Sequence, residues 1–320
     1  MASPGPGQRW RESLAGRVVV VTGAGKGLGR SYALWLAANG ARVLVNNRRS
    51  AGGGSTAAAA VDEIRSRGGT AVADAHSVAD EAGCRAIVEA ALAQFGRIDA
   101  VVCNAGRSAP IDVRSPDLAE FRAVMDVNFW GSVTLALAAL PHMLDAGWGR
   151  IVLTTSGAGW FGDPGSAFYG ASKSALLGFA RSLALDVRDR GVHVNMISPS
   201  AFTAMSARFN LGESASDAMS PDLVAPVVGW LCSDACDESG LILHAGCGRV
   251  RRIMVYGGAA VEIEGGDVSA CRPALDDMTG ARESASSLDS GAVLRAGLVA
   301  DRAEAVRGDP STGGFPRRNP

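Results

Sequence analysis

VVVVTGAGKGLGR, residues 18–30, decides the expected fold of this 320-residue chain. Four valines predict a buried strand. The glycines that follow allow a tight turn into a helix, whose positive end can approach a pyrophosphate. A glycine-rich turn alone is a weak signal, but here it lies in the first strand–turn–helix unit, the context that dinucleotide binding requires. The stretch therefore predicts a dinucleotide site formed by Thr22, Gly23, Gly25, Lys26, Gly27, Leu28 and Gly29.

Short apolar, β-branched runs alternate with helical stretches along the rest of the chain. We expect strands over residues 17–23, 41–47, 70–75, 99–106, 150–156, 192–200 and 240–246. We expect helices over residues 28–40, 57–69, 81–96, 116–146, 167–190 and 221–232. Apolar strands separated by helices are typical of a parallel sheet covered on both faces, with right-handed crossovers. The predicted fold class is α/β: a single doubly wound, Rossmann-like parallel sheet of about seven strands with helices on both faces.

The amino-acid composition of the sequence changes near residue 250. We expect residues 1–250 to form one dinucleotide-binding and catalytic domain. Residues 251–320 form a C-terminal extension that we expect to be partly disordered, because its later part is rich in Ala, Gly, Ser, Asp and Arg. Within it, GGAAVEIEGGD, residues 257–267, could form a short pair of strands.

Composition excludes some classes of partner. The chain is 47% hydrophobic and 20% charged, with a formal net charge of −1, which gives no electrostatic argument for nucleic acid or an acidic membrane. The first residues lack a secretory signal and no apolar run reaches membrane-spanning length, so we expect a cytoplasmic protein. The basic pair Arg48-Arg49 and the group Arg249, Arg251 and Arg252 are interpreted as solvated patches.

The six cysteines predict no metal site. None forms a C-x-x-C pair, and no second pair near Cys232 and Cys236 completes a zinc site. We interpret all six as reduced thiols, packed as small apolar side chains.

FYGASKSALLGFARSL, residues 168–183, combines a tyrosine with a rare lysine. Lys26 and Lys173 are the only lysines, although Lys and Arg together number 31. Tyr169 and Lys173 are four residues apart on a predicted helix and so share one face. A nearby ammonium stabilises a phenolate and lowers the pKa of the phenol from about 10. Lysine is compact and can also donate to a ribose hydroxyl, tasks that suit the wide arginine fork less well.

Six motifs together resemble the short-chain dehydrogenase/reductase family across residues 17–246. They are TGAGKGLG (22–29), NAG (104–106), DVNFWGS (126–132), TTS (154–156), YGASK (169–173) and NMISPS (195–200). The resemblance implies an oxidoreductase in which Tyr169 exchanges a proton with the substrate while hydride moves. Ser156 would hydrogen-bond the substrate oxygen and Lys173 would support Tyr169. Asn128 would hold a water that links Lys173 to solvent; a helix-kinking core residue is the alternative.

Cofactor preference depends on the end of the second strand. An acidic residue there would bind the ribose 2′-OH of NAD. This chain has Asn47 followed by Arg48, with Lys26 in the glycine loop. The resemblance then favours NADP(H), with NAD(H) possible, unless both cations simply face solvent.

The rest of the cofactor site is assigned by resemblance. His76 stands where the family often has an adenine-contacting Asp, and is either such a contact or a surface histidine. Ser200 replaces the usual glycine after Pro199, and either Thr203 or Ser206 would contact the carboxamide. The other implied cofactor residues are Ser77, Val78, Asn104, Ala105, Gly106, Tyr169, Lys173, Pro199, Ser200 and Ala201.

Longer segments resemble the (3R)-hydroxyacyl-CoA dehydrogenase domain of peroxisomal multifunctional enzyme type 2. They include residues 16–47, 65–78, 95–106 and 220–240. The implied substrate is a 3-oxoacyl or 3-hydroxyacyl thioester, or a related β-keto compound. Because the acidic NAD residue is absent and the end of the chain diverges, a specialised-metabolite ketoreductase, polyketide or aromatic, is the alternative.

A different class of function is also considered. A non-catalytic NADP(H)-sensing or scaffold protein on the same fold would bind cofactor without turnover. The set of Asn128, Ser156, Tyr169 and Lys173 disfavours it, because a sensor needs no proton relay. Residues 157–165, with Trp160 and Phe161, and residues 201–220 are expected to line the substrate pocket; for Trp160 a place in the core is the alternative. By analogy, a homodimer or homotetramer is expected to form through residues 116–146 and 167–190.

Overall fold

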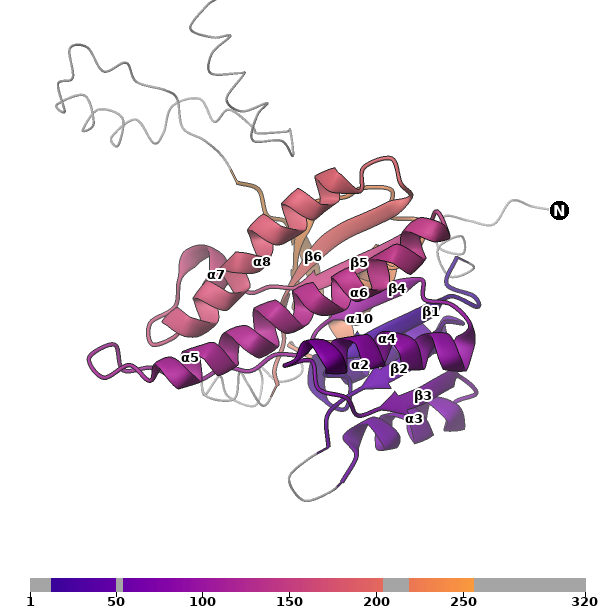
Figure 1. Cartoon of the computed structure of the whole chain (residues 1–320), viewed down its shortest axis with the longest axis horizontal. Helices are drawn as coiled ribbons and strands as arrows, with labels where there is room; N and C mark the ends of the chain where they lie inside the picture. The colour runs from indigo at the N-terminus through magenta and orange to yellow at the C-terminus, as the bar shows by residue number, and fades with distance from the viewer. Residues whose placement is uncertain (1–12, 50–53, 204–218, 256–320) are drawn as a thin grey trace, which may run out of the picture. The chain divides into compact units, whose positions relative to one another are not determined.

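A mostly parallel sheet lies at the centre of the structure (Figure 1). The computed structural model describes residues 13–49, 54–203 and 219–255, and eight strands of this part form one sheet in the order β3-β2-β1-β4-β5-β6-β7-β8. All neighbouring pairs are parallel except β7–β8. The strands are β1 (Val18–Thr22), β2 (Arg42–Asn46), β3 (Thr70–Asp74), β4 (Ala100–Cys103), β5 (Gly149–Thr154), β6 (Val192–Ser200), β7 (Ile242–Gly246) and β8 (Arg249–Arg252).

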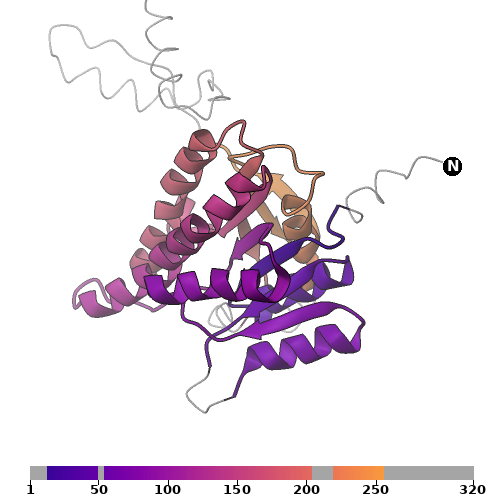
Figure 2. The same cartoon turned by 45° about the vertical axis from the view of Figure 1, so that its right-hand side comes forward.

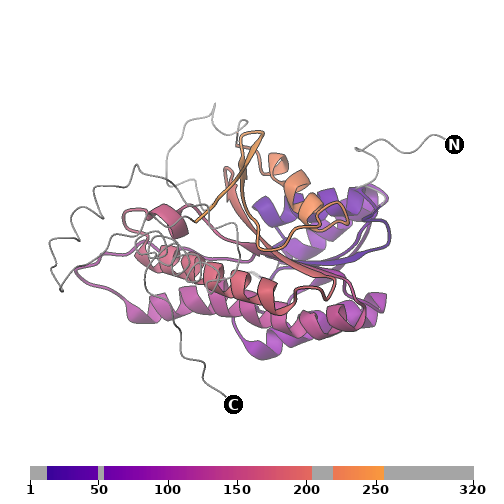
Figure 3. The ribbon, with the colours of Figure 1, turned by 90° about the horizontal axis from the view of Figure 1, so that it is seen from above.

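Helices cover both faces of this sheet (Figure 2, Figure 3). On one face lie α2 (Gly27–Ala38), α3 (Thr56–Ser66) and α10 (Ala225–Leu231). On the other lie α4 (Glu81–Phe95), α6 (Gly131–Asp145) and α8 (Ala167–Asp186). The remaining elements are α5 (Leu118–Met125), the π-helical turn η1 (Asp126–Trp130), α7 (Ala158–Phe161) and the 3₁₀ turn η3 (Pro221–Leu223).

Burial on both faces explains why the strands are apolar throughout. In β1, Val19 and Val21 pack in the core beside α2, whereas Val18 and Val20 pack in the core beside α4 and α6. Successive strand residues point to opposite faces, so a strand covered on both sides has no solvent-facing position left for polar residues. The predicted α/β fold class with a doubly wound sheet is confirmed.

Three local features differ from the sequence expectation. The helix predicted over 167–190 ends at Asp186, because the chain turns back through Asp189 and Gly191, which both have positive φ. The helix predicted over 221–232 divides into η3 and α10. The strand β8 was not predicted. It follows β7 through Cys247 and Gly248 at φ 51° and 67°, the pattern of a two-residue type I′ hairpin.

The end of the chain is described only in part. One compact unit of the chain ends at Ile253. The predicted strand pair at 257–267 and the predicted disorder of the extension lie outside the described residues, apart from residues 251–255.

The continuous helical stretch Leu118–Asp145 is the one described segment long and apolar enough to span a membrane. Of the most apolar 18 residues of this stretch, 44% are buried inside the protein. Core helices of globular proteins can be equally long and apolar. Its exposed apolar residues include Trp130 and Leu137, at 55% and 46% exposure.

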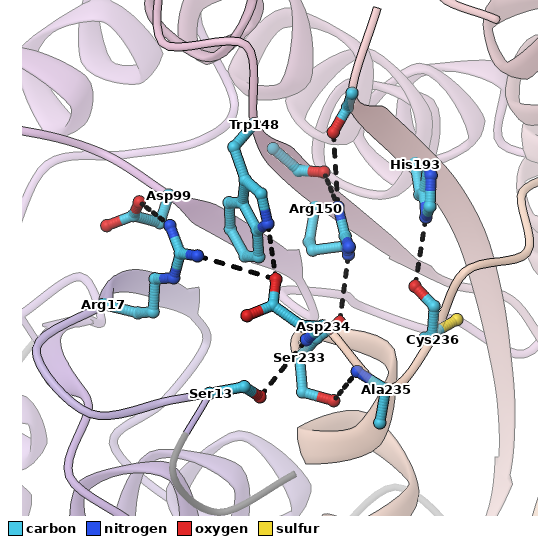
Figure 4. Close-up of polar contacts among 12 residues, drawn as sticks. Ser13, Arg17, Asp99, Trp148, Arg150, His193, Ser233, Asp234, Ala235 and Cys236 are labelled. Atoms are coloured by element: carbon cyan, nitrogen blue, oxygen red, sulfur yellow. Dashed lines mark hydrogen bonds and ion pairs between the residues drawn. The ribbon is translucent and has the colours of Figure 1, made fainter. Parts of the chain in front are cut away.

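A charged cluster joins the loops at the amino-terminal edge of the sheet (Figure 4). The Arg17 guanidinium reaches between two carboxylates, with Nη1 3.1 Å from Asp99 Oδ1 and Nη2 3.5 Å from Asp234 Oδ1. Trp148 Nε1 donates to Asp234 at 2.6 Å, and the guanidinium carbons of Arg17 and Arg150 lie 3.7 and 4.4 Å from the Trp148 ring centroid. This cluster ties the starts of β1, β4 and β5 to the segment after α10.

Removal of the Asp99 carboxylate is expected to destabilise the fold without changing catalysis. Its side chain is 2% exposed, and it accepts bonds from the guanidinium groups of Arg17 and Arg97 and from the Val18 N–H at 2.8 Å. Loss of a buried charge with several donors costs about 3 kcal/mol. We therefore expect Asp99→Ala to lower the free energy of unfolding by that amount in urea titrations, with kcat/KM unchanged.

Asp112→Ala is the matched control, since the pair of Asp112 with Arg114 is solvent-exposed. Its urea midpoint is expected to equal that of the wild type. Equal midpoints for the two variants would show that the buried carboxylate contributes nothing.

Candidate active site

The glycine loop is fixed to the loop after β4. Thr22 Oγ1 accepts bonds from the N–H groups of Asn104 and Ala105, both at 3.1 Å, and Asn104 Nδ2 donates to Thr22 O at 2.9 Å. Gly23 has φ 64°, and a Cβ there would lie 2.9 Å from Ala105 Cα. Two predicted cofactor loops are thus held together at the carboxyl edge of the sheet, where ligands of open α/β sheets bind.

The start of α2 fits a pyrophosphate. Helices α3, α4 and α5 have side-chain N-caps, from Ser55, Asp80 and Asp117. In contrast, α2 begins after Lys26, which makes no side-chain cap bond, and its first turn contains no acidic residue. Its first N–H groups therefore lack the side-chain partner that α3, α4 and α5 have, and they follow the glycine loop directly, an arrangement suited to binding phosphate at a helix N-terminus.

The predicted selector of the ribose phosphate lies against the glycine loop. Asn47 Nδ2 donates to Thr56 Oγ1 at 2.8 Å, and a Cβ on Gly25 would collide with both side chains. Arg48 follows and is exposed, as is Lys26. The structure thus places Asn47, rather than a carboxylate, beside the loop that would hold the phosphates.

Asn46 and Asp74 organise the predicted adenine side. Asn46 Nδ2 donates to Asp74 Oδ1 at 2.6 Å and to the His76 carbonyl at 2.9 Å. His76 Nδ1 lies 2.7 Å from Asp74 Oδ2, and its side chain is 53% exposed. Ser77 and Val78 follow, half-buried, and Val78 packs against the core beneath α4.

Lys173 is the most deeply buried cation of the predicted site. It is 2% exposed, and its Nζ donates to the Thr154 carbonyl at 2.8 Å. Burial lowers the pKa of this ammonium to about 8. The Nζ lies 5.8 Å from the centroid of the Tyr169 ring, so the helix α8 brings the predicted pair together.

Asn128 lies in the π-helical turn and is fully buried. Its Oδ1 accepts from the Arg107 N–H at 2.8 Å, and its Nδ2 donates to Arg107 O and Ser172 Oγ, both at 2.9 Å. A Cβ on Gly106 would lie 3.4 Å from Asn128 Oδ1 and 3.7 Å from Lys173 Nζ. Asn128 and Lys173 therefore border the same glycine, and π-helical turns are frequent at functional sites.

Ser156 stands at the carboxyl end of β5, just before α7. Its Oγ accepts from the Ala158 N–H at 3.3 Å. The short helix α7 packs closely on α8, since a Cβ on Gly159 would lie 2.9 Å from the Ser174 nitrogen. This contact fixes the segment that carries Ser156 against the helix that carries Tyr169.

The segment after β6 also lies at the carboxyl edge of the sheet, near the glycine loop. Pro199 and Ser200 end β6, Ala201 is 8% exposed, and Ser200 Oγ lies 3.5 Å from His244 Nε2. Thr203 approaches the glycine loop, because a Cβ on Gly27 would lie 3.6 Å from Thr203 Cγ2. The alternative carboxamide contact, Ser206, lies outside the described residues, as does most of the predicted pocket segment 201–220.

Sequence reasoning missed the residues that hold this site in place. Arg107 binds Asn128 through its backbone, and Ser172 joins Asn128 to the Tyr169 carbonyl, to which it donates at 2.7 Å. The helical spacing of Ser172 and Tyr169 was visible in the sequence, but the approach of Arg107 depends on the packing of the loop after β4. Trp160, left open between core and pocket, is half-buried and packs against the core beside α8, whereas Phe161 is 82% exposed.

Comparisons with known proteins agree with this geometry. The family model for short chain dehydrogenases matches residues 17–213. A short-chain type dehydrogenase/reductase of Mycobacterium tuberculosis is 38% identical over 275 residues, which cover 83% of this chain and 96% of that relative. The crystal structure of a short chain dehydrogenase from Mycobacterium avium has a TM-score of 0.74 and 35% identity, covering 85% of this chain and 97% of that one.

A multidomain relative is similar to the same region. Peroxisomal multifunctional enzyme type 2 of Mus musculus is 41% identical over 243 residues, which cover 74% of this chain and 32% of the mouse protein. The chain thus spans about a third of the length of that enzyme. Together with the motif order and the sheet, these matches show that the chain belongs to the short-chain dehydrogenase/reductase family and is an NAD(P)-dependent oxidoreductase acting on CH–OH groups.

Proposed function

We propose that the protein is an NADP(H)-dependent ketoreductase or hydroxyl dehydrogenase that acts on a 3-oxoacyl or 3-hydroxyacyl thioester or a related β-keto compound. The observation that carries this proposal is the buried Lys173 ammonium beside Tyr169 on α8. A cation removed from water is costly, and its position next to a phenol gives it a chemical use.

Tyr169 is the proton donor in reduction and the acceptor in oxidation. The Lys173 charge favours the phenolate over the phenol, so the proton leaves Tyr169 more readily. Bound nicotinamide would supply or accept the hydride. Because the Lys173 Nζ already has the Thr154 carbonyl as one partner, two of its three N–H bonds stay available for a ribose hydroxyl and the proton relay.

Ser156 and Asn128 complete the proposed set. The Ser156 Oγ accepts from Ala158, which leaves its own O–H to donate to the substrate oxygen and stabilise developing negative charge. Asn128 is held by three hydrogen bonds, so its side chain has one fixed position beside Gly106 and Lys173. That position would fix where a water of the proton relay binds. A water held there would resupply the proton.

The thioester assignment comes from the segments that resemble the hydroxyacyl dehydrogenase domain and from the mouse relative. The other activities of a multifunctional enzyme are not part of the proposal, since the chain spans only a third of that protein. A specialised-metabolite ketoreductase would share the chemistry and differ in the substrate. Assays with NADPH and a panel of β-keto thioesters, aromatic ketones and quinones separate the two, and thioesters are expected to give the highest kcat/KM.

We also propose that the protein is a homodimer or homotetramer formed through α5–η1–α6 and α8. The exposed Trp130 and Leu137 lie on this helical stretch, and burial of such large apolar side chains favours association. Light scattering at several concentrations measures the assembly.

Tyr169→Phe is expected to reduce kcat by roughly 100- to 10,000-fold, because it removes the proton that general acid catalysis transfers. NADPH affinity, measured by fluorescence titration, is expected to stay within about twofold of wild type. Tyr32→Phe is the matched control. Its hydroxyl is buried and has no hydrogen-bond partner among the described residues, so its loss should leave kcat unchanged. Wild-type turnover by Tyr169→Phe would exclude the assignment.

Lys173 should also leave a signature in the pH dependence of stability. Its pKa falls from 10.5 to about 8 on folding, so the unfolded chain binds more protons between these values. The cost of the buried charge is fully present below pH 8 and disappears as the pH rises to 10.5. Cofactor-free wild type should therefore gain up to about 3 kcal/mol relative to Lys173→Met across this window, measured by urea denaturation. Parallel stability curves for the two proteins would mean that the ammonium is well solvated.

Asn47 is expected to set the cofactor preference. The wild type should use NADPH with a higher kcat/KM than NADH, because the position after β2 holds Asn47 and no carboxylate, Arg48 follows it, and Lys26 lies in the adjacent glycine loop. Asn47→Asp should shift the ratio towards NADH by at least about tenfold, through repulsion of the phosphate. Arg49→Gln tests whether any change of charge in this segment has the same effect, and it should not. Equal use of both cofactors by the wild type would reject the preference.

A further inference from the structure

The α8 face of the sheet changes from apolar to polar near its carboxyl edge. Residues that pair across β6, β7 and β8 lie in rows on one face. The lowest row contains Met196 and Ile242, both in the core under α8, with Ile253 bonded to Ile242 and packed against that core. Apolar side chains of this kind are expected where a helix covers the face of a sheet.

The two rows above it are polar. In the middle row Ser198 pairs with His244, which pairs with Arg251. In the upper row Ser200 pairs with Gly246, which pairs with Arg249. Because side chains alternate along a strand, these residues share the α8 face with Ile242. A sheet face that continued under apolar cover would not place hydroxyls, an imidazole and two guanidinium groups here.

Three polar side chains in these rows have no hydrogen-bond or ion-pair partner among the described residues. Ser198 is 1% exposed, and its Oγ has no hydrogen-bond partner among the described residues. Arg249 and Arg251 are exposed, and neither forms an ion pair with a carboxylate of the described segments. Arg252 differs from them: it pairs across to Leu243, so it lies on the opposite face, and its Nη1 is 3.3 Å from Glu238 Oε2. The basic group is therefore divided between the two faces of β8. Arg252 is paired on one face, and Arg249 and Arg251 have no acidic partner among the described residues on the other.

His244 adds no competing positive charge to the face of Arg249 and Arg251. Burial, and then the neighbouring Arg251, lowers the pKa of its imidazole below the usual value. This shift favours the uncharged ring, whose Nε2 lies 3.5 Å from the Ser200 hydroxyl. The two arginines therefore define the charge of this part of the sheet, and an anion is its complement.

The position of the two arginines suits the substrate and not the cofactor. The glycine loop follows β1 and leads to α2 on the opposite face, five strands away from β8. In contrast, Thr154 of β5 pairs with Ile197, so Ser156 lies at the level of the polar rows. Three interstrand spacings separate β5 from β8, a span of about 14 Å. An extended substrate whose carbonyl reaches Ser156 can therefore reach Arg249 and Arg251 with its far end.

We propose that Arg249 and Arg251 bind the phosphate of the carrier group to which the acyl substrate is joined as a thioester. The two residues are about 7 Å apart along the strand, so their guanidinium forks can take different oxygens of one phosphate or neighbouring phosphates. This site rests on the proposed thioester function. Its chemistry is shared by the phosphopantetheine arm of a carrier protein and by coenzyme A.

The test compares three acetoacetyl thioesters with NADPH. Acetoacetyl-pantetheine carries no phosphate, acetoacetyl-phosphopantetheine carries one, and acetoacetyl-coenzyme A carries the nucleotide phosphates as well. Steady-state kcat and KM are measured for wild type, for the double variant Arg249→Gln/Arg251→Gln, and for Arg252→Gln. The last is the matched control on the same strand, because its guanidinium lies on the other face and pairs with Glu238.

The double variant is expected to raise KM for the phosphate-bearing thioesters by about tenfold, with kcat and the pantetheine KM unchanged. Arg252→Gln should behave as wild type. A rise for both phosphate-bearing substrates assigns the phosphopantetheine phosphate, and a rise for coenzyme A alone assigns the nucleotide phosphates. In wild type these KM values should also increase with ionic strength, and the double variant should lose that dependence.

Two failures are distinguishable. If wild type reduces all three thioesters and the double variant changes none of the KM values, or all of them equally, the arginine site is wrong and the thioester function stands. If wild type reduces none of the thioesters but does reduce ethyl acetoacetate, the thioester function is wrong and the arginine site falls with it.

Discussion

The buried ammonium of Lys173 is the constraint on which the site depends. A charge that is 2% exposed is unfavourable unless its donors are occupied, and the structure supplies the Thr154 carbonyl at the end of β5. Thr155 Oγ1 in turn donates to the Lys173 carbonyl at 3.0 Å, so strand and helix are joined in both directions. An arginine would need room for five donors in a fixed plane, whereas the lysine ammonium is a compact charge that fits beside Gly106 and Asn128. A chain that uses arginine nearly everywhere else keeps lysine here for this reason.

The parallel sheet makes this arrangement rigid. Parallel strands end at one edge, so Thr22, Asn104 and Thr154 occupy the ends of β1, β4 and β5, or the residue that follows, without any need for long loops. Side chains then join neighbouring loops: Thr22 with Asn104, and Asn128 with Arg107. Because each loop is held by bonds to the next, the positions of the proposed proton donor and its cation follow from backbone geometry.

The fold and the Tyr169–Lys173 pair were predictable because both depend on short-range periodicity. Apolar runs with intervening helical stretches specify covered strands, and a spacing of four places two side chains on one helix face. The Asn128–Arg107 contact was not predictable, since it depends on strand order and on a π-helical turn whose sequence, DVNFW, has no distinctive composition. The strand β8 was missed for a similar reason: RVRR lacks the apolar content of the other strands and exists because β7 offers an edge. Local patterns identified elements, and long-range pairing decided how they meet.

The charged cluster around Asp99 and the proposed catalytic residues lie at opposite edges of the same sheet. At the amino edge, the Arg17 guanidinium pairs with the buried Asp99 carboxylate and stacks on Trp148, so these charges have partners within the described structure. At the carboxyl edge, donors are left available: the first turn of α2 has no side-chain cap, and Lys173 keeps N–H groups beyond its bond to Thr154. The hairpin β7–β8 extends this asymmetry, because its apolar residues lie low on the α8 face and its unpaired arginines lie high. A protein that neutralised Arg249 and Arg251 as it neutralises Arg252 would gain little stability from exposed pairs. Among the described residues these two arginines have no acidic partner, and they lie at the edge where the proposed cofactor and substrate groups also lie.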